Sequence, residues 1–125
     1  MAQKRDIVLA NVINQTTKGT YELSSYDTSG YSEAEYILDV TALTETGGTD
    51  AITLDVKIQS YYPATGKWKD VVIFDQVSVT GATTTSTQHK IATTGLGTKQ
   101  RVVYTLGGDG TVGDCDFKVE AVYWE

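Results

Sequence analysis

Apolar and polar residues alternate along the segment from Tyr36 to Phe74, and this alternation organises the rest of the chain. Between Ala51 and Ser60 two sets of residues alternate, the aliphatic Ile52, Leu54, Val56 and Ile58 and the polar Thr53, Asp55, Lys57 and Gln59. A two-residue period is typical of a β-strand with one buried face, whereas a helix would scatter these side chains around its axis. Tyr36 to Leu43 repeats the pattern less cleanly, with Tyr36, Leu38, Val40 and Ala42 on one side. The loop from Thr44 to Asp50 holds paired glycines, so we predict a central antiparallel hairpin.

The pattern predicts further strands after the hairpin. Tyr61 to Lys67 is expected to be a loop because its proline cannot donate to a sheet ladder. The apolar phase changes around Asp75 and Gln76, which indicates a bulge or a corner between two strands. Thr80 to Thr87 is either a loop or an exposed edge strand, and Gln88 to Thr93 is a short strand around Ile91. Two long strands follow. Lys99 to Leu106 places Val102, Tyr104 and Leu106 inward, and Cys115 to Trp124 places Cys115, Phe117, Val119, Ala121 and Tyr123 on one face.

Short strands joined by turns rich in glycine, threonine and aspartate, with no helical crossover, predict an all-β fold. We expect an antiparallel two-sheet β-sandwich, jelly-roll-like, with an irregular N-terminal arm. A small barrel is the alternative. Residues 1–32 have only a weak pattern and are interpreted as an arm or as edge strands, and residues 33–125 as the sandwich domain.

Composition and charge narrow the classes of function. A chain of 125 residues fits one domain that needs no metal or disulfide, and its single cysteine, Cys115, cannot form an internal bridge. Sixteen acidic against ten basic residues give a formal charge of −6, which argues against binding nucleic acid. No apolar stretch approaches the ~20 residues of a membrane span, and Ile7 to Ala10 is too short for the core of a signal peptide. We therefore expect synthesis in a cytoplasm and no membrane partner.

Few residues are arranged for catalysis. His89 is the only histidine and sits among polar residues, and Cys115 opens a strand on its apolar side, so an exposed histidine and an inert thiol are expected. Three other groups have ordinary structural interpretations. Asp109, Asp114 and Asp116 miss the spacing of a calcium-binding loop. Glu33, Glu35 and Asp39 lie along one strand and are interpreted as solvated acids rather than as the carboxylate pair of a glycosidase. Gly107 to Gly110 lacks the lysine and the helix of a phosphate-binding loop. We predict a protein that is not an enzyme and has no cofactor.

Aromatic residues are the remaining functional signal. Tyr61, Tyr62 and Trp68 border one loop, and Tyr26 and Tyr31 lie in the weakly patterned N-terminal part. Such a cluster could stack on sugar rings or anchor a protein interface. The structural alternative is that Trp68 closes one end of the sandwich and the tyrosines pack over its rim.

Several strand segments occur in a fixed order between Tyr36 and Tyr123. They are Tyr36 to Ala42, Leu54 to Gln59, Gly66 to Trp68, Phe74 to Val77, Arg101 to Gly108 and Phe117 to Ala121. Taken together, these segments resemble small structural proteins of tailed-bacteriophage heads. The resemblance contains no catalytic motif.

The resemblance implies a β-sandwich that acts as a decoration or cement protein on the outside of the capsid. It also implies a homotrimer whose partner is the major capsid protein, located at the capsid surface of the virion. Because the resemblance does not include the N-terminal part, we expect capsid contacts there and in the loops. The candidate contact residues are Lys4, Arg5, Ile7, Leu9, Tyr26 and Tyr31, and the candidate interface aromatics are Tyr61, Tyr62 and Trp68. Two alternatives remain, a carbohydrate-binding sandwich for adhesion to a host surface and a component of the phage tail or baseplate.

Overall fold

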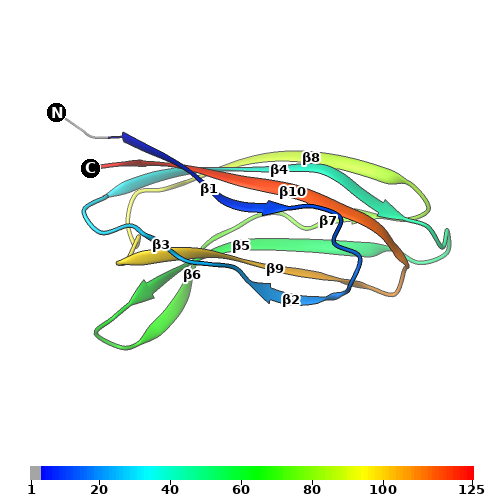
Figure 1. The fold of residues 1–125 in the computed structure, drawn as a ribbon, viewed down its shortest axis with the longest axis horizontal. Coiled ribbons are helices and arrows are strands. Elements are labelled where there is room, and N and C mark those ends of the chain that lie inside the picture. The colour runs from blue at the N-terminus through cyan, green and yellow to red at the C-terminus, as the bar shows by residue number, and fades with distance from the viewer. Residues whose placement is uncertain (1–3) are drawn as a thin grey trace.

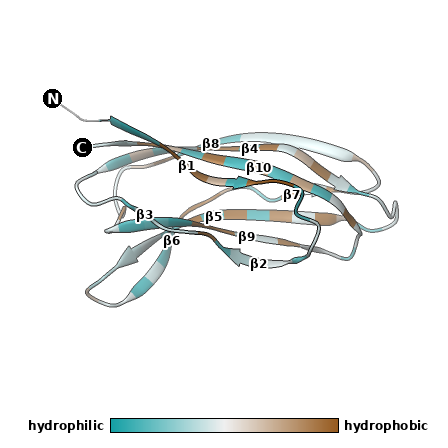
Figure 2. Cartoon of the chain, viewed as in Figure 1, coloured by the Kyte–Doolittle hydropathy of each residue, from teal (hydrophilic) through white to brown (hydrophobic). Residues whose placement is uncertain are grey.

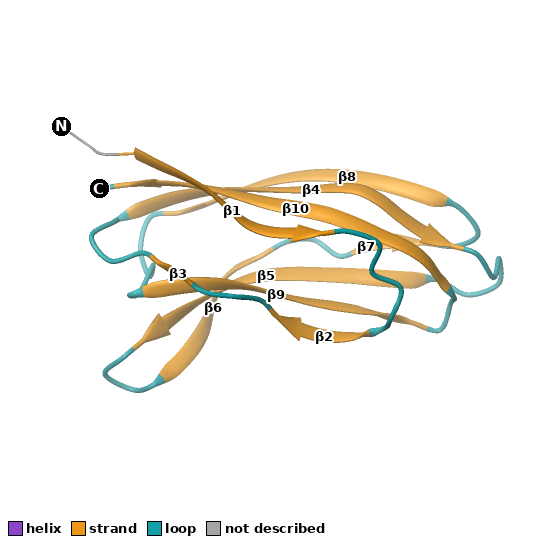
Figure 3. Ribbon diagram, viewed as in Figure 1, coloured by secondary structure: helices purple, strands orange, loops and turns teal. Residues whose placement is uncertain are grey.

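The computed structural model describes residues 4–125, which form strands, turns and loops without a helix (Figure 3). Long strands alternate with short connections, as the alternating sequence predicts. Within these residues there is no helix long and apolar enough to cross a membrane. The strands are β1 (Lys4–Val12), β2 (Gly19–Glu22), β3 (Tyr26–Asp27), β4 (Glu33–Glu45), β5 (Ile52–Tyr62), β6 (Lys67–Ile73), β7 (Val77–Val79), β8 (Thr83–Ala92), β9 (Lys99–Gly108) and β10 (Val112–Trp124).

Two antiparallel sheets pack face to face (Figure 1). The four-stranded sheet has the order β1-β10-β4-β8, and the six-stranded sheet has the order β2-β9-β5-β6, with β3 beside β9 and β7 beside β5. Because β2 and β3 both pair with β9, and β6 and β7 both pair with β5, each pair acts as one interrupted strand. The resulting eight strands pair first with last, second with seventh, third with sixth and fourth with fifth. This is the topology of a jelly roll, so the predicted sandwich is confirmed.

The core lies between the sheets and takes its side chains from alternate positions of the long strands, as the changes of colour along them show (Figure 2). The inward faces predicted for the last two long strands are confirmed. On β9, Val102, Tyr104 and Leu106 are buried. On β10, residues Cys115, Phe117, Val119, Ala121 and Tyr123 are each at most 1% exposed.

The predicted central hairpin is wrong, because β4 and β5 lie in different sheets. β4 pairs with β10 and β8, β5 pairs with β9, β6 and β7, and residues 46–51 carry the chain from one sheet to the other. Two strands that face each other across a core each bury one side, and so do two strands of a hairpin. Alternation therefore identifies the strands but does not distinguish these two arrangements.

A bulge in β4 reverses the predicted orientation of its last residues. The register between β4 and β8 shifts between Val40 and Leu43, so Leu43 is fully buried while Ala42 is only half-buried. A bulge adds one residue to one strand and thereby exchanges the two sides beyond it. The assignment of Ala42 to the inward side, with Leu43 outward, is therefore wrong.

Three loop predictions have different outcomes. The predicted loop from Tyr61 to Lys67 is shorter, since β5 continues to Tyr62 and β6 begins at Lys67. The break around Asp75 and Gln76 is confirmed, because β6 ends before it and β7 begins after it while both pair with β5. The edge-strand alternative for Thr80 to Thr87 is confirmed, because residues 83–87 join residues 88–92 of the predicted short strand in one edge strand, β8. Ile91 on that strand is 59% exposed and points outward.

The described part of the N-terminal segment contains edge strands joined by irregular stretches. β1 pairs with β10, and β2 and β3 pair with β9. Leu9 and Ala10 are buried in the core. Met1 to Gln3 lie outside the described residues. The division of the chain at residue 32, with a sandwich that folds from residue 33 onward, stays a prediction.

Candidate interaction surface

An aromatic and cationic cluster lies on the outer face of the six-stranded sheet, near the turn between β5 and β6. The strand register places Tyr61 of β5 between Trp68 of β6 and Lys99 of β9. The rings of Tyr61 and Trp68 have centroids 5.2 Å apart, and the Lys99 ammonium lies 4.7 Å from the Tyr61 centroid. A cation over an aromatic ring is attracted by the charge distribution of the ring. The three side chains therefore form one contiguous patch.

Arg101 ties this cluster to the strands around it. Its guanidinium carbon lies 4.0 Å from the Trp68 ring centroid, and its Nε donates to the side-chain oxygen of Gln59 at 3.0 Å. Its Nη1 lies 2.9 Å from a carboxylate oxygen of Glu22, and the Arg101 side chain is only 16% exposed. A planar guanidinium that is both stacked and ion-paired holds its neighbours in place. The indole is thus held in place by contacts within its own chain.

Tyr62 does not join the cluster. It is adjacent to Tyr61 in one strand, so its side chain points to the opposite face of the sheet. Its hydroxyl donates to the Gly95 carbonyl at 2.9 Å, on the connection between β8 and β9. Of the three predicted interface aromatics, Tyr61 and Trp68 therefore share a surface and Tyr62 anchors a neighbouring loop.

The candidate residues from the N-terminal part do not form one patch. Lys4 and Arg5 are exposed at the start of β1, Ile7 is half-buried, and Leu9 is only 2% exposed and packs in the core. Tyr26 and Tyr31 are half-buried against the core. The Tyr31 ring lies 5.6 Å from that of Tyr123, centroid to centroid. Of the six candidates, only Lys4 and Arg5 are therefore exposed, and the four apolar or aromatic ones pack wholly or partly against the core.

Glu45 is a structural residue that the sequence did not reveal. The backbone N–H groups of Thr111 (2.8 Å), Gly48 (2.7 Å), Gly81 (2.9 Å) and Gly47 (2.5 Å) donate to its carboxylate. These donors, with that of Thr111 foremost, lower the pKa of Glu45 to about 2 although burial opposes the shift. One carboxylate thus connects three loops at the end of the sandwich opposite the aromatic cluster. The alternation gave no signal for it, because it placed Glu45 in the loop after the strand, and the bulge between Val40 and Leu43 turns the residue inward.

The reactive residue types are dispersed. Burial raises the pKa of the Cys115 thiol to about 12, and nearby Asp116 and Asp114 add to the shift. This agrees with the inert thiol that the sequence predicts. His89 is half-exposed as expected, and its Nε2 lies 3.5 Å from a carboxylate oxygen of Glu35. Burial and the neighbouring Asp116 raise the pKa of Asp114. Within residues 4–125, no three His, Cys, Asp or Glu side chains are grouped to hold a metal ion.

No protein-family model and no curated protein sequence matches the chain. Among solved structures, the VP2 subviral particle of infectious bursal disease virus aligns with a TM-score of 0.60 and 13% identity, over 98% of this chain and 32% of that chain. The T=1 particle derived from the infectious bursal virus aligns with a TM-score of 0.60 and 14% identity, over 98% of this chain and 31% of that one. The chain therefore spans about a third of the length of these proteins. At such low identity the likeness shows a shared fold.

The capsid structure of Helicobacter pylori bacteriophage KHP30 aligns over 100% of this chain and 94% of that chain, with 17% identity. Its TM-score is 0.48, which is too low to indicate a shared fold.

Proposed function

We propose that this chain is a non-enzymatic structural protein of a virion, and that it acts as a decoration or cement protein on the outside of an icosahedral phage head. The observation that carries the proposal is the complete jelly roll, which aligns over 98% of this chain with VP2 of a viral particle. Jelly rolls are frequent in viral capsids, although they also occur in lectins and cupins. The sequence resemblance to structural proteins of phage heads supports the same role independently of the fold.

The construction of the domain suits such a role. Its core is aliphatic and aromatic, and the loops at one end are fixed by Glu45. A protein of this kind binds many equivalent sites on a symmetric shell, so modest individual contacts add up to a stable particle. We propose a homotrimer and the major capsid protein as its partner.

Binding to heads tests the proposal. Purified protein is mixed with heads that lack it, and the particles are imaged by electron microscopy while the oligomer mass is measured in solution. We expect added density on the outside of the shell and a trimer in solution or on the particle. Heads that bind no protein, together with a monomeric mass, would contradict the proposal. Density confined to the tail would indicate the baseplate alternative.

A carbohydrate-binding function is the second candidate, because Tyr61 and Trp68 form an aromatic pair at the surface. Arg101 and Lys99 lie over these two rings, and rings covered by cations are less available to sugars. A titration with glycans followed by tryptophan fluorescence distinguishes the two functions. The capsid proposal predicts no change in fluorescence.

A further inference from the structure

The outward side of the four-stranded sheet carries an unusual combination of exposed aliphatic and acidic side chains, and we call it the acidic face. Four large hydrophobic side chains are strongly exposed in the described residues, and three of them lie here: Val8 at 51%, Ile91 at 59% and Ile13 at 64%. The half-buried Ile37 and Val122 lie between Val8 and Ile91. Soluble domains seldom expose a contiguous apolar patch without a binding role.

The strand register makes the aliphatic side chains contiguous. In one row across the sheet, Val8 of β1 lies opposite Glu120 of β10, which lies opposite Ile37 of β4. In the next row Val122 of β10 lies opposite Glu35 of β4, and Glu35 lies opposite Ile91 of β8. Residues that are diagonal in adjacent rows are within reach of each other. The aliphatic run therefore crosses all four strands.

Acidic residues surround this run. Among the described residues, basic side chains on this face are limited to Lys4, Lys118 and His89, and His89 lies opposite Ile37 with its Nε2 3.5 Å from a carboxylate oxygen of Glu35. Against them stand seven acidic side chains, which are Asp6, Glu33, Glu35, Asp39, Asp114, Asp116 and Glu120.

The outer face of the six-stranded sheet is nearly balanced, and it contains the ion pairs Lys57 with Asp70 at 3.2 Å and Arg101 with Glu22 at 2.9 Å. The net charge of −6 therefore resides mainly on the acidic face.

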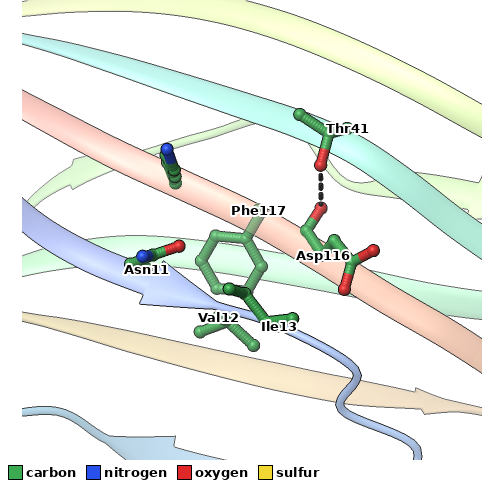
Figure 4. Close-up of a pocket in the computed structure, with 7 residues that line it drawn as sticks. Asn11, Val12, Ile13, Thr41, Asp116 and Phe117 are labelled. Carbon is green, nitrogen blue, oxygen red and sulfur yellow. Dashed lines mark hydrogen bonds between the residues drawn. The ribbon is translucent and has the colours of Figure 1, made fainter.

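Two depressions run along β10 on this face and share Lys118. One, of about 310 Å³, is lined by Asn11, Val12 and Ile13 from β1 and the residues after it, and by Thr41 of β4 (Figure 4). In its wall the Thr41 hydroxyl donates to the Asp116 carbonyl at 3.3 Å. The other, of about 300 Å³, is lined by Val8, Ile37, Asp39, Lys118 and Glu120. Both offer room for protruding side chains of a partner.

We propose that the acidic face docks a protein surface on which lysine and arginine side chains surround aliphatic groups. Aliphatic side chains of the partner would cover the run from Val8 to Ile91, and its cations would meet the surrounding carboxylates. The choice of that partner as the capsid shell rests on the proposed function. Four strands about 4.8 Å apart and about nine residues long give a face of roughly 15 by 30 Å, which suits a weak contact repeated many times.

A second copy of the chain is excluded as the occupant in a two-fold contact. Such a contact places the same surface on both sides, so seven carboxylates would face seven others. Like charges brought together across an interface are unfavourable. The balanced face of the six-stranded sheet offers no compensating excess of positive charge either.

An NMR titration of the isotope-labelled full chain with a synthetic peptide of alternating lysine and valine tests the chemistry of the acidic face. We expect chemical-shift changes concentrated on outward residues of β1, β4, β8 and β10, and weaker binding as salt is added. Shift changes spread over both sheets, or no binding at low salt, would overturn the inference.

Matched variants show which residues of the acidic face contribute to peptide binding. Glu35→Gln with Glu120→Gln should weaken peptide binding by roughly two- to tenfold, because each exposed charge pair contributes modestly. The control is Asp55→Asn with Asp75→Asn, which removes the same charge outside the acidic face and should leave the affinity unchanged. For the aliphatic part, Ile91→Ser should weaken binding, whereas Ile73→Ser, at the equally exposed Ile73 on the other sheet, should not. Equal effects of test and control variants would contradict the proposal.

The same variants separate this inference from the proposed function when they are mixed with heads. Heads that bind the wild type and every variant equally would overturn the acidic face as the docking surface while leaving the virion role intact. Heads that bind no form of the protein would contradict the virion role, and the peptide titration would then decide on the acidic face alone.

Discussion

A hydrogen-bond network around Gln100 joins the two sheets inside the core. The hydroxyls of Tyr36 on β4 and Tyr123 on β10 donate to the Gln100 side-chain oxygen at 2.6 and 2.8 Å. The Gln100 side-chain nitrogen donates to the Ser60 hydroxyl on β5 at 2.9 Å. All four residues are fully buried. Burial raises the pKa of Tyr36 to about 12 and also raises the pKa of Tyr123, so both phenols are neutral donors at neutral pH.

The hydrogen-bond geometry predicts that removing different residues of this network lowers the free energy of unfolding by different amounts. Tyr36→Phe removes one of two donors to the Gln100 oxygen, which keeps its bond from Tyr123, so the free energy of unfolding should fall by about 1 kcal/mol. Gln100→Met keeps a similar side-chain volume but leaves three hydroxyls buried without this partner. Each unpaired group costs about 1–3 kcal/mol, so the expected loss is about 3 kcal/mol or more.

The effect of Tyr36→Phe on the free energy of unfolding should change sign when this substitution is combined with Gln100→Met. In the Gln100→Met background the Tyr36 hydroxyl has lost its acceptor, so Tyr36→Phe should raise the free energy of unfolding by about 1 kcal/mol instead of lowering it. Equilibrium unfolding in urea, followed by the fluorescence of Trp68 and Trp124, measures both values. Tyr21→Phe is the control, since the Tyr21 hydroxyl donates to the Thr17 carbonyl at the surface and should have the same effect in both backgrounds. A Tyr36→Phe effect that is identical in both backgrounds would refute the network.

Three further predictions follow from single side chains. The Cys115 thiol should resist a disulfide reagent in the folded protein and react fully in urea, because it is buried and its pKa is raised to about 12; a colorimetric thiol assay measures this. The pKa of Glu45 falls from 4.5 to about 2 on folding, so its stabilising effect is complete above about 4.5 and is lost as the pH falls toward 2. Urea midpoints of Glu45→Gln should therefore depend less on pH in this range than those of the wild type. Leu9→Ala should lower the free energy of unfolding by about 2–5 kcal/mol if β1 belongs to the core, and calorimetry would show almost no change if β1 were a loose arm.

The two-residue period predicted most strands and their inward sides, because burial acts on each strand separately. Val102 and Phe117, for example, lie on the inward sides that the alternation indicated. Pairing between strands depends on hydrogen bonds to partners far along the chain, and nothing in the pattern of β4 or β5 specifies them. The bulge after Val40 escaped prediction because an inserted residue changes the phase without leaving a distinctive residue type.

Within the candidate surfaces, the sequence predicted only those contacts that join residues close to each other along the chain. Tyr61 and Trp68 flank a short turn, so their pairing across β5 and β6 follows from the turn itself. Arg101 reaches the same cluster from β9, and no local pattern connects it with Trp68. The acidic face was equally hidden, since its rows combine residues from β1, β4, β8 and β10 that are far apart in the sequence.

The different charge of the two outer faces bears on how the proposed trimer could form and still bind the proposed shell. A three-fold contact joins two different patches of each copy, so it does not require a self-complementary surface. The face that carries Tyr61, Trp68 and Ile73 is nearly balanced in charge and partly apolar, and copies can approach through it without strong repulsion. The acidic face repels its own copies and, as proposed above, docks a basic surface. We therefore expect the six-stranded sheet to serve contacts between copies and the four-stranded sheet to face the shell.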